Sequence, residues 1–164
     1  MALSFIALGS NVAGRFASPA AAVEAAIDTF RVNNINILCR SRLYRSAAWP
    51  NPLDPEFVNA VAAADTDLPP AALLARLHEI EAEFGRIRRL ANAPRTLDLD
   101  IVDYAGLVSG EGESPLLPHP RMADRSFVLL PLAEVAPDWR HPVTGRAIDE
   151  LIRALPDQQA ATPL

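Results

Sequence analysis

One stretch near the middle of the chain constrains the fold most, because apolar and acidic residues alternate along it. From Leu97 to Ile101 every second residue is apolar, and Asp98 and Asp100 occupy the positions between. Alternation with a period of two indicates a β-strand with one apolar and one polar face. Both carboxylates therefore leave the same face, with their Cβ atoms roughly 6–7 Å apart. We expect this strand to cover residues 97–104.

The spacing of these two carboxylates points to a metal. Carboxylates this close repel each other, and partial burial increases the repulsion. A divalent cation relieves it, and Mg²⁺ is usually held by one or two carboxylates together with substrate phosphates. The bland alternative, a strand with a solvated acidic face, is the commoner meaning of a bare Asp-x-Asp pattern. Here four arginines, Arg86, Arg88, Arg89 and Arg95, precede the pair and supply charge for a polyphosphate.

Composition narrows the range of partners. The 164 residues are half apolar and carry a net charge of −5, which favours one compact domain and argues against general nucleic-acid binding. The single cysteine, Cys39, excludes an internal disulfide and fits a reducing compartment. The first residues lack a basic signal segment, and no apolar run has membrane-spanning length. We expect a cytoplasmic monomer without nucleic-acid or membrane partners, with a single domain over residues 1–158 and a frayed tail at 159–164.

Periodicity and turn residues predict the order strand, helix, strand, strand, helix, strand. The strands are expected at 3–8, 35–44, 57–64 and 97–104, the helices at 18–31 and 67–85, and two further short helices at 127–135 and 147–155. This order fits an α+β fold with a ferredoxin-like βαββαβ antiparallel sheet, helices packed on it and extra C-terminal helices. One sheet face would then remain for ligands or for the C-terminal segments.

Asn59 shares a predicted strand face with Phe57. A partly buried amide must find hydrogen-bond partners. The amide of Asn59 either forms hydrogen bonds with nearby loop backbone or recognises a flat heterocycle through hydrogen bonds while Phe57 stacks on the ring. Both interpretations remain open from the residues alone.

Two further candidates are polar residues in unusual places. Glu81 lies at the edge of the apolar stripe of its predicted helix, so it either extends to water or faces a site. His119 lies between two prolines, outside any regular helix or central strand, and Arg125 follows it. His119 either caps local backbone or contacts a phosphate.

Several other mechanisms find no support in the sequence. It contains no G-x-x-x-x-G-K-[ST], G-x-G-x-x-G or G-x-S-x-G motif. One cysteine and three scattered histidines do not favour a zinc site.

The chain resembles a known family in a series of short stretches, which include the motifs above and occur in the same order as in the family. The matching stretches are 7–11, 44–46, 57–60, 80–81, 85–86, 94–100, 117–121, 125 and 127–129. Over residues 5 to about 137 the chain resembles 6-hydroxymethyl-7,8-dihydropterin pyrophosphokinases. The chain departs from the family's common Arg-Trp-Gly-Pro-Arg segment, since residues 91–95 read Ala-Asn-Ala-Pro-Arg.

The resemblance implies transfer of the β,γ-diphosphate of ATP to the pterin hydroxymethyl group, with release of AMP. It implies two Mg²⁺ ions bridged by Asp98 and Asp100, with Arg86 and Arg95 completing the catalytic set. It assigns the pterin to Ser46, Ala47, Ala48, Phe57, Asn59 and Phe127, and ATP to Glu81, Arg86, Arg88, Arg95, His119 and Arg125. Loops 46–56 and 86–96 would close over ATP and exclude water.

Two other functions compete with this interpretation. A catalytically silent module would act through binding alone, and a two-metal nucleotidyltransferase would release pyrophosphate in place of AMP. The identity of the product distinguishes all three.

Overall fold

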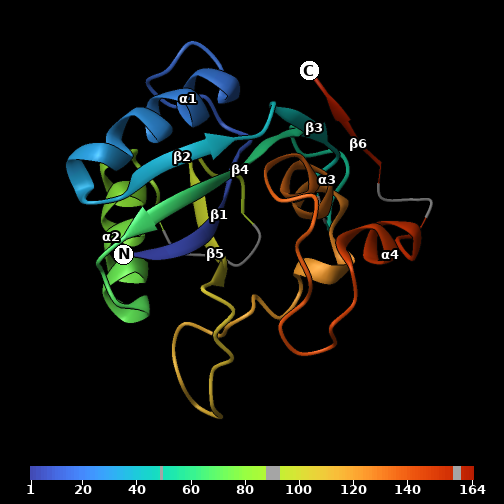
Figure 1. Ribbon diagram of the computed structural model, residues 1–164. Helices are drawn as coiled ribbons and strands as arrows, with labels where there is room; N and C mark the ends of the chain where they lie inside the picture. Colours follow the sequence, from blue (N-terminus) through green and yellow to red (C-terminus); the bar gives the residue numbers. More distant parts are fainter. Residues whose placement is uncertain (49, 88–92, 157–159) are drawn as a thin grey trace.

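The computed structural model describes residues 1–48, 50–87, 93–156 and 160–164. Figure 1 shows helices on both sides of a twisted sheet. The elements in chain order are β1 (Ala2–Ser10), α1 (Pro19–Phe30), the 3-10 helix η1 (Arg31–Asn33), β2 (Asn36–Arg40), β3 (Tyr44–Ser46), β4 (Phe57–Thr66), α2 (Pro70–Glu83), β5 (Asp98–Tyr104), the 3-10 helix η2 (Met122–Asp124), α3 (Ser126–Val135), α4 (Ile148–Arg153) and β6 (Ala161–Pro163).

The described strands form one antiparallel sheet. Its order is β5-β1-β4-β3-β6, and β2 also pairs with β4. The centre consists of β1 and β4, paired from Ala2 opposite Thr66 to Ser10 opposite Val58. A residue near the end of β1 therefore has neighbours on β4 and on β5 at once, and this arrangement positions the site.

The predicted continuous strand over 35–44 was wrong, because the chain divides there into β2 and β3. Ser41 lies between the two strands, and its backbone N–H donates to the carbonyl of Val61 at 2.9 Å. The Ser41 hydroxyl accepts the N–H of Val61 at 3.0 Å, in place of a backbone carbonyl. A serine hydroxyl can thus interrupt a ladder without leaving a buried donor unpaired.

Apolar side chains cover both faces of the sheet. On one face Leu8 and Leu99 pack with residues of α1 and α2. On the other face Phe5 and Val102 pack with residues of α3 and α4. Figure 1 shows the two helix pairs on opposite sides of the sheet. The predicted α+β class, with helices on an antiparallel sheet and added C-terminal helices, is confirmed, whereas the ferredoxin-like strand order remains a prediction.

The helix starts follow local sequence. α1 begins where expected, because the Ser18 hydroxyl accepts the N–H of Ala21 at 3.1 Å and Pro19 occupies the first turn. α2 begins with Pro70 and buries Leu73, Leu77 and Ile80 against the sheet. These two helices cover one face of the sheet, and the site lies on the opposite face, which α3 and α4 also cover in part.

The expectation of a frayed tail over 159–164 needs correction. Residues Ala161–Pro163 form β6, which pairs with β3 in the register Ser46 opposite Ala161. The N–H of Leu164 donates to the carbonyl of Leu43 at 2.9 Å. The segment is short and consists mainly of small residues and a proline, so nothing in its composition indicates a strand. The edge of β3 provides the pairing partner.

The longest described helix, α2, has 14 residues. A bilayer-spanning helix needs about 20 apolar residues. Among the helices that the structure describes, none is long and apolar enough to cross a membrane.

Candidate active site

The acidic pair lies on β5, and its two side chains share the face that the sequence predicted. Leu99 and Ile101 are buried on the α1/α2 side. Asp98 and Asp100 alternate with them and line a cavity on the opposite side of the sheet. The cavity encloses about 400 Å³, which lies in the range of small-molecule sites.

Two arginines hold the carboxylate of Asp98 from different directions. Arg86 donates from Nη1 to Asp98 Oδ1 at 2.5 Å and to the carbonyl of Leu97 at 3.2 Å. Arg95 donates from Nη1 to Asp98 Oδ2 at 3.2 Å. Because both carboxylate oxygens are engaged, the side chain of Asp98 has a fixed orientation at the cavity wall.

Glu81 supports this arrangement from behind the strand. Only 1% of its surface is exposed. Its Oε1 accepts the backbone N–H of Leu99 at 2.8 Å and lies 3.4 Å from Arg86 Nη1. The carboxylate therefore connects α2, β5 and Arg86, and the position of Asp98 depends on all three.

Asp100 lies in a region of unfavourable negative charge. Burial raises the pKa of Asp100, and the nearby carboxylates of Asp98 and Glu81 act in the same direction, so that the pKa reaches about 6 against the opposing effect of Arg125 and Arg86. A free carboxylate is costly here, and a bound cation would remove that cost.

His119 and Arg125 face the same carboxylates. Burial lowers the pKa of His119 to about 4, with Arg125 and Arg121 acting in the same direction, so the imidazole is neutral near pH 7. Its Nδ1 accepts the backbone N–H of Arg121 at 3.2 Å, and its Nε2 lies 3.9 Å from Asp100 Oδ2. The two interpretations of His119 are therefore compatible: one ring nitrogen supports local backbone, and the other faces the cavity.

Asn59 lies on the far side of the cavity and is 4% exposed. Its Nδ2 donates to the hydroxyl of Ser46 at 2.8 Å. A Cβ atom added at Gly9 would lie 3.2 Å from Asn59 Oδ1 and 3.7 Å from the ring of Phe57. The carbonyl oxygen of Asn59 therefore lies directly above the bare backbone of Gly9.

Strand register explains this geometry. Gly9 is opposite Asn59 on β4 and opposite Asp98 on β5. Directly opposed residues of antiparallel strands share a face. One row across three strands thus carries an amide, a glycine and a carboxylate, and the glycine leaves the floor between the other two open.

Most of the site residues expected from the sequence come together around this cavity. Its lining includes Ser46, Ala47, Ala48, Phe57, Asn59, Arg95, Asp98, Asp100, His119, Arg125 and Phe127. Glu81 and Arg86 do not belong to that lining and reach it through Asp98 and β5. Arg88, expected to contact ATP, lies outside the described residues, as do Arg89 and Trp49.

Several residues that the structure places at the site had no role predicted from the sequence, among them Asn11, Arg121 and Ala160. Asn11 accepts the N–H of Arg95 at 2.8 Å through Oδ1 and donates from Nδ2 to the carbonyl of Pro55 at 3.1 Å. Arg121 and Ala160 line the cavity. Asn11 and Arg121 belong to the stretches 7–11 and 117–121 that match the family, and this match could have identified them. No feature of the sequence pointed to Ala160.

The donor set fits magnesium. Both candidate ligands are carboxylates on one strand face, and oxygen donors are those that Mg²⁺ prefers. Within the described ranges, no group of three or more His, Cys, Asp or Glu side chains is arranged to hold a metal. A cation at this pair would need phosphate or water oxygens to complete its shell, which is how Mg²⁺ is commonly bound in nucleotide sites.

Comparison with known proteins agrees with this geometry. A family model described as 7,8-dihydro-6-hydroxymethylpterin-pyrophosphokinase (HPPK) matches residues 5–137. The 2-amino-4-hydroxy-6-hydroxymethyldihydropteridine pyrophosphokinase of Pseudomonas aeruginosa is 45% identical over 157 residues, covering 93% of this chain and 91% of that protein. The Haemophilus influenzae protein of the same name is 36% identical, covering 97% of this chain and 96% of that protein.

Longer proteins also match. The folic acid synthesis protein fol1 of Pneumocystis carinii is 39% identical over 93% of this chain, which spans only 20% of that protein. Among solved structures, a Plasmodium falciparum HPPK-DHPS triple mutant superposes with a TM-score of 0.68 at 13% identity, covering 93% of this chain and 44% of that one. This last likeness shows the fold alone.

The family model covers most of the chain, and two bacterial relatives match it over nearly their full lengths. The chain belongs to the 7,8-dihydro-6-hydroxymethylpterin-pyrophosphokinase family.

Proposed function

We propose that the protein transfers the β,γ-diphosphate of ATP to the hydroxymethyl group of 6-hydroxymethyl-7,8-dihydropterin, releasing AMP, as a step of folate biosynthesis. The observation that carries this proposal is the row of Asn59, Gly9 and Asp98 along one cavity. The row offers a group that can read a heterocycle at one end and a phosphate–metal site at the other. Family membership supplies the identity of the two substrates.

The pterin would lie at the Asn59 end. Because Ser46 accepts one amide hydrogen, Asn59 Oδ1 remains over the floor as an acceptor for an amino group on the heterocycle. Phe57 and Phe127, from β4 and α3, both line the cavity and would contact the two faces of a flat ring. Ala47 and Ala48 also line the cavity, and their backbone groups would contact the edge of the ring.

The triphosphate would lie at the Asp98 end. Asp98 and Asp100 would hold two Mg²⁺ ions, which neutralise phosphate charge and orient the phosphates when bound. Arg95 and Arg125 line the same part of the cavity. Because His119 is neutral and its Nδ1 already accepts a hydrogen bond, its Nε2–H is available as a donor to a phosphate oxygen.

These residues act by positioning and by charge. Phosphoryl-type transfer needs little covalent assistance from the protein, and its main requirements are in-line placement and stabilisation of charge. Asn11 contributes to placement, since it connects Pro55 in the loop before β4 with Arg95 in the segment before β5. A movement of the loop that contains Pro55 would therefore shift the segment that contains Arg95.

We also propose the broader setting of this activity. A net charge of −5 and a single cysteine support a cytoplasmic monomer that binds no nucleic acid. The sheet includes β6, so we extend the single domain from residue 158 to residue 164.

Nucleotide product analysis tests the function. The protein is incubated with ATP, Mg²⁺ and 6-hydroxymethyl-7,8-dihydropterin, and the expected product is AMP that forms only when the pterin is present. Free pyrophosphate would identify a nucleotidyltransferase, and ADP would identify single phosphoryl transfer. A folded protein that binds the ligands without turnover would be a binding module. Asp98→Asn serves as the matched inactive control.

A further inference from the structure

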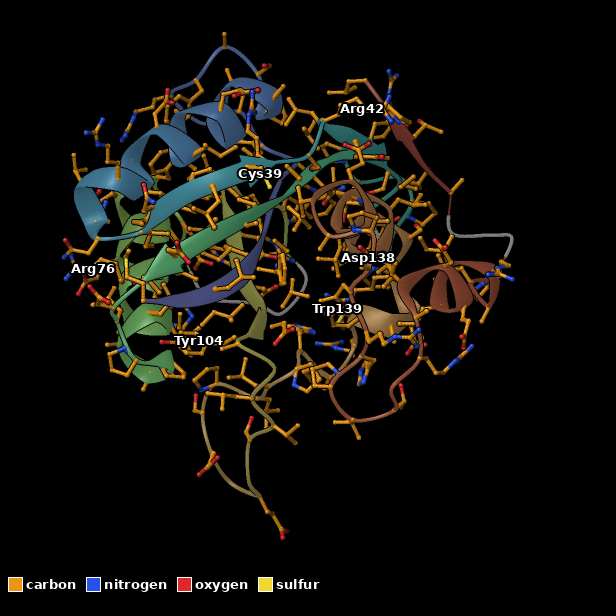
Figure 2. The ribbon with its side chains drawn as sticks, viewed as in Figure 1. Cys39, Arg42, Arg76, Tyr104, Asp138 and Trp139 are labelled. Carbon is orange, nitrogen blue, oxygen red and sulfur yellow. The ribbon has the colours of Figure 1, made fainter. Side chains whose placement is uncertain are left out.

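Glu134 lies in the last turn of α3 and binds Tyr44, the first residue of β3, and Arg42, which lies two residues before it. Its Oε2 accepts the backbone N–H of Arg42 at 2.9 Å, and its Oε1 accepts Arg42 Nε at 2.9 Å. The Tyr44 hydroxyl donates to the same Oε1. Figure 2 labels Arg42 at the end of the sheet near β3 and β6. One carboxylate thus connects a helix and a strand 90 residues apart in sequence.

The two connected elements each carry part of the cavity wall. α3 presents Phe127 in its first turn, and Glu134 follows seven residues later, two turns along the same side of the helix. β3 presents Ser46, which lies two residues from Tyr44 and on the same face of the strand. Ser46 and Phe127 both line the cavity, so the separation of these walls depends on how α3 sits against β3.

The strand register places Tyr44, which binds Glu134, next to a residue of the site. Tyr44 is directly opposite Asn59 on β4. Tyr44 is 5% exposed and packs in the sheet beside the residue that would read the pterin. A shift of Tyr44 would therefore move both Asn59 and its partner Ser46.

The contact is built as an ionised network. Burial alone would raise the pKa of Glu134, but hydrogen bonds from Tyr44 and from the backbone and guanidinium of Arg42 lower it below its usual value. The carboxylate is consequently charged at neutral pH, and charge-assisted hydrogen bonds are stronger than neutral ones.

We propose that Glu134 is a positioning residue that sets the separation between the Phe127 and Ser46 walls and thereby the affinity for the pterin. The proposal rests on the proposed function, because that function places the pterin between these walls. Glu134 is not among the cavity-lining residues, so it acts through Tyr44, Arg42 and the two elements.

The test compares Glu134→Gln and Tyr44→Phe with a matched control. Glu24→Gln removes a comparable ion pair, between Glu24 Oε2 and Arg40 Nη1 at 2.7 Å, that joins α1 to β2 away from the cavity. For each variant we would measure Tm, KM for pterin and for ATP, and the Kd of the pterin with Mg²⁺ and a non-hydrolysable ATP analogue.

We expect Glu134→Gln to raise the KM and Kd of the pterin about tenfold, since small displacements of binding groups are costly. Tyr44→Phe should act in the same direction to a smaller extent. The KM of ATP should change less than twofold in both, and Glu24→Gln should leave both KM values unchanged. Equal increases for the two substrates, or a lower Tm with unchanged pterin affinity, would overturn the positioning role.

The two proposals fail separately. If the wild-type protein neither binds nor converts the pterin, the proposed function is wrong. If the wild-type protein does both and the Glu134 and Tyr44 variants match it, only the positioning role is wrong.

Discussion

Asn59 and Asp98 lie at the two ends of one row across the sheet, each directly opposite Gly9. Neighbouring strands are about 4.7–4.9 Å apart, so the two backbones are separated by roughly 9–10 Å. This span suits a bicyclic heterocycle that carries its reacting substituent at one end. In the proposed function, the register of β1 would therefore couple recognition of the ring to placement of the phosphates.

The floor of this row gives the first prediction. Gly9→Ala would place a Cβ 3.2 Å from Asn59 Oδ1, in the space where the pterin would lie, and Gly9→Val would fill more of it. We expect pterin affinity to fall in Gly9→Ala and to fall further in Gly9→Val, with a smaller effect on ATP. Titration calorimetry with each ligand measures this. Gly110→Ala, in an exposed loop, is the control, and equal affinities in all three variants would refute the role of the open floor.

The acidic pair gives a prediction in which activity and stability diverge. Asp98→Asn and Asp100→Asn should each lower kcat by at least about a hundredfold, because each removes a proposed metal ligand. In the metal-free protein, Asp100→Asn should keep or raise Tm, since it removes a charge repelled by Asp98 and Glu81. Asp98→Asn should lower Tm, since Arg86 and Arg95 lose their shared partner. Kinetics and calorimetry of the two variants decide, and an active Asp100→Asn protein would exclude that residue from the metal site.

The contacts of Glu81 predict a mainly structural effect of its replacement. Glu81→Gln keeps an acceptor for the N–H of Leu99 but removes the charge beside Arg86. We expect a loss of about 1–3 kcal/mol in the free energy of unfolding. For a domain of this size, each kcal/mol lowers Tm by roughly 2–4 °C. The KM of ATP should stay within about twofold of wild type, because a residue behind β5 has no direct route to a cavity ligand. A tenfold rise in that KM with an unchanged Tm would instead support direct nucleotide contact.

The network at Glu134 predicts a pH-dependent contribution to stability. Its carboxyl has a lower pKa in the folded protein than the usual value of 4.5, so ionisation favours the folded state. The contribution is present above pH 4.5 and disappears as the pH falls through the folded-state pKa. Thermal unfolding at pH 7 and near pH 3 should show a Tm difference between wild type and Glu134→Gln that is larger at pH 7. A difference that is the same at both pH values would contradict the assignment.

Local patterns predicted the parts of the site that depend on local geometry. Alternation in a strand placed Asp98 and Asp100 on one face, and the cap and proline at Ser18 and Pro19 placed the start of α1. These features depend on residues within a few positions of one another, where periodicity and capping chemistry act directly.

The rest depends on pairing between distant segments. Gly9 forms the open floor of the cavity only because β4 and β5 both pair with β1 at that residue. No local sequence pattern predicts this register. Glu81 and Glu134 each bind backbone in another part of the chain, at Leu99 and Arg42. The division of the strand at Ser41 likewise follows from its contact with Val61. Such contacts become visible only when the sheet is assembled.

The short strand β6 also affects how the molecule meets its neighbours. Without it, β3 would present unpaired backbone groups at the rim of the cavity, and an exposed strand edge is a template for pairing with another chain. β6 occupies that edge with three residues and ends in Pro163, which has no N–H to offer to a further strand. The protein can therefore keep an open cavity beside the edge of its sheet without presenting that edge for aggregation with a second copy.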